Sequence, residues 1–411
     1  MGSEKTSNYL FMLSGLLDAV KVLGIMWVYE LFWADNFGRL SFNIDLIGAF
    51  GALLTPWLMA YLQKSRESAA QAYIIVLIYL LILSGVVGSA YWILANYLLA
   101  GGLDSIEDFN VFIALRALSL IVITLTTLNY SVLAQAGHGL YIFLFQLCAV
   151  SATLGLYYIF SDYGLYSSLV YVGVVLLLLE LAIMKMTFNM AKKHLGITRF
   201  WRRVLEFKYL NEFKGYSRIV FPETGTVLSV VACTFLISSS AYITLQEHYE
   251  FYRLPLAFMT ASWIVASKVT TLLVSFSKTD AVAFSMQNYM YTIRYTWYIP
   301  VLLLLIYVAL FYQRLNYLIC INVVVAMLYF PAMAAVIAMG GSLRVQNRNA
   351  LLLKANLAML CFYFIPVVAL IYLRFIGAGG LIHAIGVSYL VRIMVINWLG
   401  IRELRRDGAL I

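Results

Sequence analysis

Charged side chains inside long apolar segments are the residues of this chain whose types could do chemistry. Six are basic and four are acidic: Lys21, Arg116, Lys268, Arg294, Lys354, Arg392, Asp18, Asp45, Glu180 and Glu223. Each costs roughly 2.5–3.5 kcal/mol at the centre of a membrane helix, so most must form ion pairs, extend to the membrane surface or line water. Cations that line water can bind an anion, and carboxylates there can carry a proton or a sodium ion.

Position along the segments sorts these charges. Lys354 and Arg294 lie near segment ends, where a long side chain can extend to the surface. The candidate residues of a substrate-binding cavity are Lys21, Lys268, Arg116, Asp45, Glu223, Asp18 and Arg392. A structural alternative exists for Asp18, which lies one helical turn before Lys21 and is spaced for a local ion pair with it.

Motifs of catalytic and metal sites are missing from the sequence. No Gly-rich loop ends in Lys-Ser or Lys-Thr, so a nucleotide phosphate site of that kind is not expected. The four cysteines stand singly in apolar segments, and the four histidines lie at or near segment ends without a partner at ligand spacing. We expect no enzymatic activity, no catalytic residue, no metal site and no bound cofactor.

Composition shows what must position these charges. Hydrophobic residues make up 63% of the 411 residues and charged residues only 11%, whereas soluble domains carry roughly 25% charge. Segments of twenty or more apolar residues without alternation indicate membrane-spanning helices and not the strands of a β-barrel. The sequence predicts an all-α integral membrane protein of twelve helices, at about 8–33, 41–63, 71–100, 109–136, 139–161, 164–187, 219–246, 252–277, 287–312, 316–341, 350–373 and 379–400.

Loop charges predict the orientation in the membrane. The even-numbered loops and both tails hold seventeen Lys and Arg residues, whereas the odd-numbered loops hold four: Arg39, Arg253, Arg314 and Arg374. Basic loops stay in the cytoplasm, so both termini are predicted to be cytoplasmic in the cell inner membrane. The net charge of +9 is explained by this bias and by contact with anionic membrane lipids, and no nucleic-acid partner is expected.

Similar segments recur at nearly constant offsets. Phe37-Gly38-Arg39-Leu40 opens the second predicted helix and Phe251-Tyr252-Arg253-Leu254 opens the eighth, while Gly164-Leu165 and Gly380-Leu381 mark the sixth and twelfth. This favours a duplicated six-helix lobe, with a pseudo-twofold axis along the membrane normal. The predicted parts are residues 1–187, a basic linker at 188–218, and residues 219–411 with a short cytoplasmic tail. The linker is either an amphipathic surface helix carrying Ile197, Trp201, Val204 and Leu205 or a simple basic connection.

The chain resembles the polysaccharide flippases of the MOP superfamily, the Wzx-type O-antigen carriers, over nearly its whole length. The resemblance rests on the six-plus-six layout, the Trp33-Ala34-Asp35-Asn36-Phe37-Gly38 turn, the Arg344-Val345-Gln346-Asn347-Arg348 loop and the Gly377-Ala378-Gly379-Gly380-Leu381 segment. It implies a MATE-like fold and a cationic central cavity walled by helices 1, 2, 7 and 8. Lys21, Asp45, Glu223 and Lys268 fall on those helices, and related lipid II flippases place basic residues in helices 1 and 8.

The implied activity is alternating-access transport of a polyprenyl-pyrophosphate-linked oligosaccharide from the inner to the outer leaflet, for cell-surface polysaccharide biosynthesis. The expected partners are this lipid-linked glycan, membrane lipids and a polysaccharide polymerase, and one chain has all the parts of a working monomer. Two negative charges moving outward gain roughly 4.6 kcal/mol per 100 mV, so the membrane potential can drive export. Coupling to protons or sodium ions through Asp45 or Glu223 remains open. The alternative function is a MATE-type multidrug or organic-cation antiporter.

Overall fold

A computed structural model describes residues 2–99, 106–198, 213–245, 249–276 and 286–406. All regular secondary structure within these ranges is helical, as the composition predicts. The first half contains α1 (Gly2–Phe32), α2 (Phe37–Ala52), α3 (Thr55–Leu99), α4 (Ile106–Gln135), α5 (Gly139–Phe160) and α6 (Leu165–His194). The second half contains α8 (Phe213–Leu245), α9 (Tyr249–Phe276), α10 (Met286–Thr296), α11 (Ile299–Phe311), α12 (Tyr317–Leu328), α13 (Phe330–Val345), α14 (Asn349–Met359), α15 (Ile365–Tyr372) and α16 (Ala378–Arg406).

Ten helical stretches of the described residues are long and apolar enough to cross a membrane. They cover ten of the twelve predicted spans. The seventh and eighth predicted spans correspond to α8 and α9, helices of 33 and 28 residues that lie outside these ten. The predicted all-α, multi-pass membrane architecture is therefore confirmed.

Prolines divide four of the predicted spans. Pro300, Pro331 and Pro366 each lie in the first two positions of a new helix, α11, α13 and α15, and Pro56 is the second residue of α3. Proline has no N–H to donate and crowds the preceding turn, so each span is built as two helical pieces. A π-helical turn, Leu360–Phe364, lies directly before the last of these breaks. The second and third predicted helices also merge into α3, with a non-helical residue only at Ser68.

The chain divides into two compact units. The first comprises Met1–Leu17 and Gly24–Val220, and the second comprises Asp18–Leu23 and Phe221–Ile411. The short segment Asp18–Leu23, in the middle of α1, thus groups with the C-terminal half. The predicted surface helix of the linker falls largely on residues 199–212, outside the described ranges.

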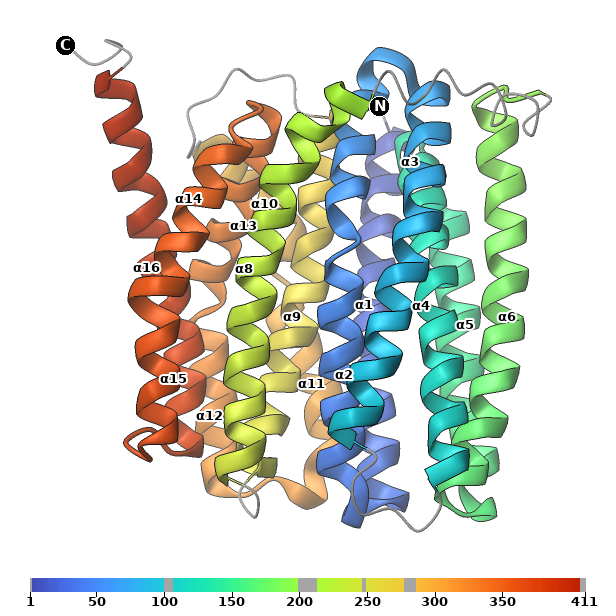
Figure 1. Cartoon of the computed structure of the whole chain (residues 1–411), viewed down its shortest axis with the longest axis vertical. Helices are drawn as coiled ribbons and strands as arrows, with labels where there is room; N and C mark the ends of the chain where they lie inside the picture. Colours follow the sequence, from blue (N-terminus) through green and yellow to red (C-terminus); the bar gives the residue numbers. More distant parts are fainter. Residues whose placement is uncertain (1, 100–105, 199–212, 246–248, 277–285, 407–411) are drawn as a thin grey trace. The chain divides into compact units, whose positions relative to one another are not determined.

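In the first unit, α4 packs against α3 and α6, and α5 packs against α6 (Figure 1). Polar side chains join three of these helices. Tyr73 of α3 donates a hydrogen bond of 2.7 Å to Asn129 Oδ1 of α4, and Asn129 Nδ2 donates one of 3.1 Å to Thr187 Oγ1 of α6. Such bonds between helices fix the register of helices whose apolar faces would otherwise slide past each other.

A close contact joins α1 and α5 of the same unit. The backbone N–H of Gly139, the first residue of α5, donates a 2.9 Å hydrogen bond to Ser7 Oγ of α1. A Cβ atom at Gly139 would overlap the Ser7 carbonyl oxygen. Only glycine therefore lets the two helices approach this closely.

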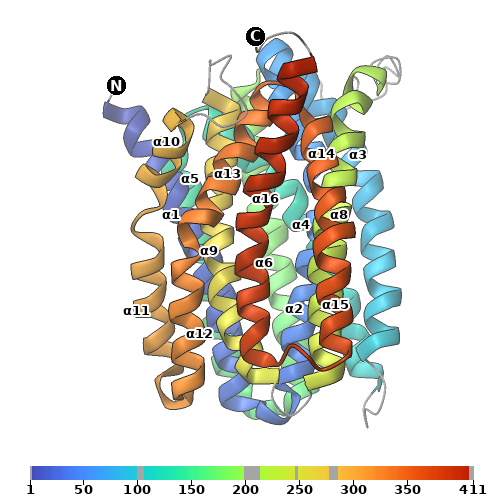
Figure 2. The same ribbon diagram turned by 90° about the vertical axis from the view of Figure 1, so that its left-hand side faces the viewer.

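In the second unit, α9 packs against α11, α12, α13 and α16, while α16 also contacts α13 and α14 (Figure 2). A cluster of fully buried apolar side chains joins α13, α14 and α16, and includes Met339, Leu343, Leu351 and Ile396. This packing holds the half of α16 that carries the buried Arg392.

Candidate functional site

An ion pair joins two of the predicted cavity residues. Lys268 Nζ of α9 lies 3.0 Å from Asp18 Oδ2 of α1, and both side chains are largely buried, at 18% and 28% exposed. Asp18 belongs to the segment that groups with the second unit, so the pair lies within that unit. The local pairing of Asp18 with Lys21 was the structural alternative; the structure gives Asp18 a partner on another helix.

Lys21 completes this group. It follows Asp18 by three residues on α1 and is half-buried. Residues three apart lie on one face of a helix, so Lys21 shares the face of α1 that carries the pair with Lys268. Two of the three residues Asp18, Lys21 and Lys268 are basic. We name these three residues the α1–α9 charge group.

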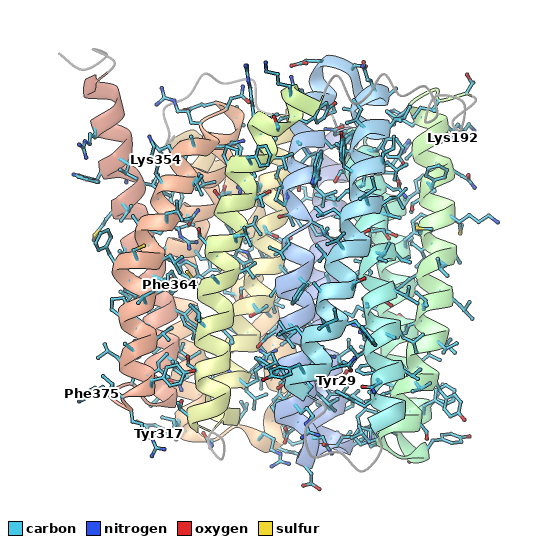
Figure 3. The ribbon with its side chains drawn as sticks, viewed as in Figure 1. Tyr29, Lys192, Tyr317, Lys354, Phe364 and Phe375 are labelled. Atoms are coloured by element: carbon cyan, nitrogen blue, oxygen red, sulfur yellow. The ribbon has the colours of Figure 1, made fainter. Side chains whose placement is uncertain are left out.

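Arg116 of α4 lies in a second polar region, inside the first unit. Its guanidinium interacts electrostatically with Tyr157, Glu180, Tyr29 and Tyr91. The hydroxyls of Tyr29 and Tyr157 lie 3.2 Å apart, and their rings meet edge to face at 5.7 Å. Tyr29 is labelled in Figure 3. Arg116 therefore has a carboxylate and three phenol groups in its surroundings.

The hydroxyl of Tyr91 extends this region to α2. Tyr91 of α3 donates a 2.7 Å hydrogen bond to Asn43 Oδ1. Asp45, two residues after Asn43, is half-buried in the same helix. The structure thus places Asp45 on the helix that contributes Asn43.

Glu223 has a different environment from the one expected of a cavity residue. Its carboxylate accepts two hydrogen bonds from Arg344, from Nε at 2.8 Å and Nη2 at 3.0 Å, and its side chain is 1% exposed. The pair joins α8 to the end of α13. Two parallel bonds between a guanidinium and a carboxylate are a strong, directional contact. Proton or sodium coupling through Glu223 would require this pair to open.

Arg392 of α16 lines a cavity of about 180 Å³ inside the second unit. The cavity lies among α8, α9, α16 and the π-helical turn, and its walls include Cys233, Thr260, Trp263, Phe364 and Tyr389. Phe364 is labelled in Figure 3. Arg392 is 7% exposed, and its Nε has no hydrogen-bond partner among the described residues. No described residue lining this cavity is acidic.

Within the second unit, Asp18, Lys21 and Lys268 form one group, while Glu223 and Arg392 each have their own surroundings. Arg116 and Asp45 belong to the first unit. The pairing of Glu223 with Arg344 and the tyrosines around Arg116 were not predicted. Arg253 was predicted to be a loop residue, whereas it lies in the first turns of α9 with 1% exposure.

No signal in the sequence marks these partners as neighbours. Glu223 and Arg344 are 121 residues apart, and Tyr29 and Tyr157 are 128 apart. For Arg253 the signal was its place in the segment Phe251-Tyr252-Arg253-Leu254, which was predicted to open the eighth helix.

A scan of protein-family models finds no match for this chain, and a search of curated proteins finds none either. Solved structures do match. An outward-facing multidrug resistance MATE family transporter of the MOP superfamily is 14% identical, with a TM-score of 0.70 over 97% of this chain and 96% of the other. The eukaryotic MATE transporter AtDTX14 is 14% identical, with a TM-score of 0.64 over 97% and 95%.

A MOP superfamily transporter from Pyrococcus furiosus, described as having a binding pocket of reverse polarity that suggests a different function, is 15% identical. Its TM-score is 0.60, over 97% of this chain and 96% of the other. At these identities the likeness concerns the fold. This chain has the all-α membrane fold of the MATE and MOP superfamily transporters.

Proposed function

We propose that this protein is an alternating-access transporter that moves an anionic lipid-linked oligosaccharide, of the polyprenyl-pyrophosphate class, from the inner to the outer leaflet. The observation that carries the proposal is the α1–α9 charge group. Its one carboxylate, Asp18, is already paired with Lys268, and Lys21 lies on the same face of α1. A site with more cations than carboxylates attracts a phosphorylated headgroup and repels an organic cation.

The fold supports the transport part of this proposal. Proteins of the same fold are transporters, by the descriptions of those structures. The lipid part follows from the chemistry of the substrate: the polyprenyl chain stays in the bilayer, so the protein needs to shelter only the charged neck and the sugars. That Arg116 of the first unit also binds the pyrophosphate stays a prediction, because Glu180 and three tyrosines already surround its guanidinium.

The orientation belongs to the same proposal. With basic loops and both termini in the cytoplasm of a cell whose interior is negative, the anionic headgroup moves outward down the electrical gradient. We propose that one chain is the working unit and that a polysaccharide polymerase receives the product. Asp45 is the remaining candidate for ion coupling, because Glu223 is held by Arg344.

The alternative function is a MATE-type antiporter for organic cations. The observation in its favour is the fold, since both structures described as multidrug or MATE transporters match almost the whole chain. A cation exporter needs an acidic group that can bind its substrate. In the α1–α9 charge group that role could fall only to Asp18, whose carboxylate is paired with Lys268.

The experiment that tests the proposal reconstitutes the purified protein in liposomes with a fluorescent polyprenyl-pyrophosphate oligosaccharide, with and without an imposed voltage. The double variant Lys21→Ala/Lys268→Ala should lose at least about tenfold in flipping rate, because two charge-assisted contacts to phosphate are removed. Lys185→Ala is the matched control. It removes an exposed cation from α6 and should flip at the wild-type rate.

Asp18→Asn separates the two functions. In a glycan flippase, the variant should flip the glycan at the wild-type rate or faster, because the charge group becomes more positive. In a cation antiporter, the variant should lose transport of a fluorescent cation such as ethidium. Wild-type flipping by the double lysine variant, or ethidium export that depends on Asp18, refutes the proposed function.

A further inference from the structure

The cavity around Arg392 is separate from the α1–α9 charge group in its lining residues and in its chemistry. None of Asp18, Lys21 and Lys268 lines it. Its walls are mostly apolar and aromatic. The rings of Trp263 and Tyr389 stack with their centroids 5.8 Å apart and their planes at 7°, and they form an aromatic wall. Arg392 is the one charged side chain among the described residues that line the cavity.

The surroundings of Arg392 do not offset its charge. The groups that interact electrostatically with its guanidinium are Tyr389 and Cys233, which are both neutral side chains near pH 7. The hydroxyl of Ser388, also in the wall, donates its hydrogen bond to the backbone oxygen of Ile385 at 2.6 Å. Burying an unpaired charge is costly, and a counter-ion with matching hydrogen bonds removes much of that cost.

Charge and size together select the class of ligand. One guanidinium matches one negative charge, and its planar fork binds a carboxylate through two parallel hydrogen bonds. The volume of about 180 Å³ equals about six water-sized groups at about 30 Å³ each. It holds a carboxylate with a short apolar stretch, and the aromatic wall supplies the apolar contacts.

We propose that this cavity is a binding site for a monocarboxylate with an apolar body, held by Arg392 and packed against Trp263 and Tyr389. Such a ligand has two sources, an aliphatic acid derived from lipid or a water-soluble aromatic acid. This site does not depend on the proposed transport substrate, because it uses none of the residues of the α1–α9 charge group.

The test measures equilibrium binding of radiolabelled octanoate and benzoate to the purified full-length protein in lipid nanodiscs. The wild-type protein should bind one carboxylate per chain, and neither octanol nor octyltrimethylammonium should compete. Tighter binding of octanoate assigns the aliphatic source and tighter binding of benzoate the aromatic source, and each result supports the site.

Two variants remove different parts of the site. Arg392→Met keeps most of the side-chain volume but removes the charge, and should weaken binding at least about tenfold through loss of charge-assisted hydrogen bonds. Val230→Phe fills the cavity from α8 while Arg392 remains, and should also weaken binding. Lys185→Met removes an exposed cation of α6 and should bind like the wild type.

Wild-type octanoate affinity in Arg392→Met, or full competition by octyltrimethylammonium, overturns the proposal. The proposal is also overturned if neither acid binds to wild-type protein that elutes as a single folded species. A failure here leaves glycan flipping by the wild type intact, so it is distinguishable from a failure of the proposed function.

Discussion

Arg116 and Arg392 are arginines in membrane helices, one in each compact unit, and their surroundings differ: Arg116 is half-buried and Arg392 is buried. Arg116 has the carboxylate of Glu180 and three tyrosines as electrostatic partners. Among the described residues, Arg392 has Tyr389 and Cys233 as electrostatic partners, and it lines an apolar cavity. Arg116 thus belongs to a polar network of the protein, whereas no described residue neutralises the charge of Arg392. A cation inside a membrane helix therefore indicates a ligand site only where the protein itself supplies no partner for its charge.

Removing the charge of Arg116 should have the largest effect. Arg116→Met removes a cation that interacts electrostatically with the buried Glu180, and taking a nearby cation away from a buried carboxylate costs up to about 3–5 kcal/mol. Thermal unfolding of the variant and of the wild type, measured in one detergent, should show a lower melting temperature for the variant. The double variant Arg116→Met/Glu180→Gln removes the orphaned carboxylate charge and should recover part of the lost stability. A single variant as stable as the wild type would remove the contrast between the two arginines.

Removing the charge of Arg392 should act in the opposite direction. Without ligand, Arg392→Met replaces an uncompensated buried charge by an apolar side chain of similar length, which should stabilise the protein by about 1–2 kcal/mol. Thermal unfolding of delipidated wild-type and variant protein measures this gain in stability. A loss of stability as large as that of Arg116→Met would mean that the protein itself supplies a partner for Arg392.

The smallest expected effect concerns one hydroxyl near Arg116. Tyr29→Phe removes the 3.2 Å contact with the hydroxyl of Tyr157 but keeps the ring packing, so it should cost about 1 kcal/mol. Tyr158→Phe, on the exposed face of α5, is the matched control and should change nothing measurable. Equal effects of the two substitutions would show that the hydroxyl network around Arg116 contributes no stability.

The sequence predicts the helices well and their partners poorly. Apolar length alone locates the spans, because lipid forces the backbone to bond internally. Helix ends are also predictable where glycine or proline acts locally: Gly164, with φ of 81°, directly precedes α6. The spans 287–312 and 316–341 were predicted as continuous helices, and each divides into two helices at Pro300 and Pro331.

The candidate site shows the opposite balance. Sequence position identifies Lys268 and Asp18 as buried charges, but it does not tell which one meets which. Asp18 was spaced for Lys21 and also contacts Lys268, which is 250 residues further along the chain. Glu223 was predicted to line a cavity, and the sequence did not indicate that its carboxylate is bound by Arg344. These pairings depend on how helices pack side by side, and no local pattern encodes that.

The divided spans of the second unit carry a cost in a bilayer. A proline leaves a backbone carbonyl oxygen in the preceding turn without its usual N–H donor. Lipid hydrocarbon has no hydrogen-bond donor for such an oxygen, so the freed carbonyl has to face protein. Pro300 frees the carbonyl oxygen of Thr296, a residue that is 0% exposed, as this requires. Pro300 therefore restricts how its span can rotate, because a rotation about the helix axis that exposed this carbonyl oxygen to lipid would cost free energy.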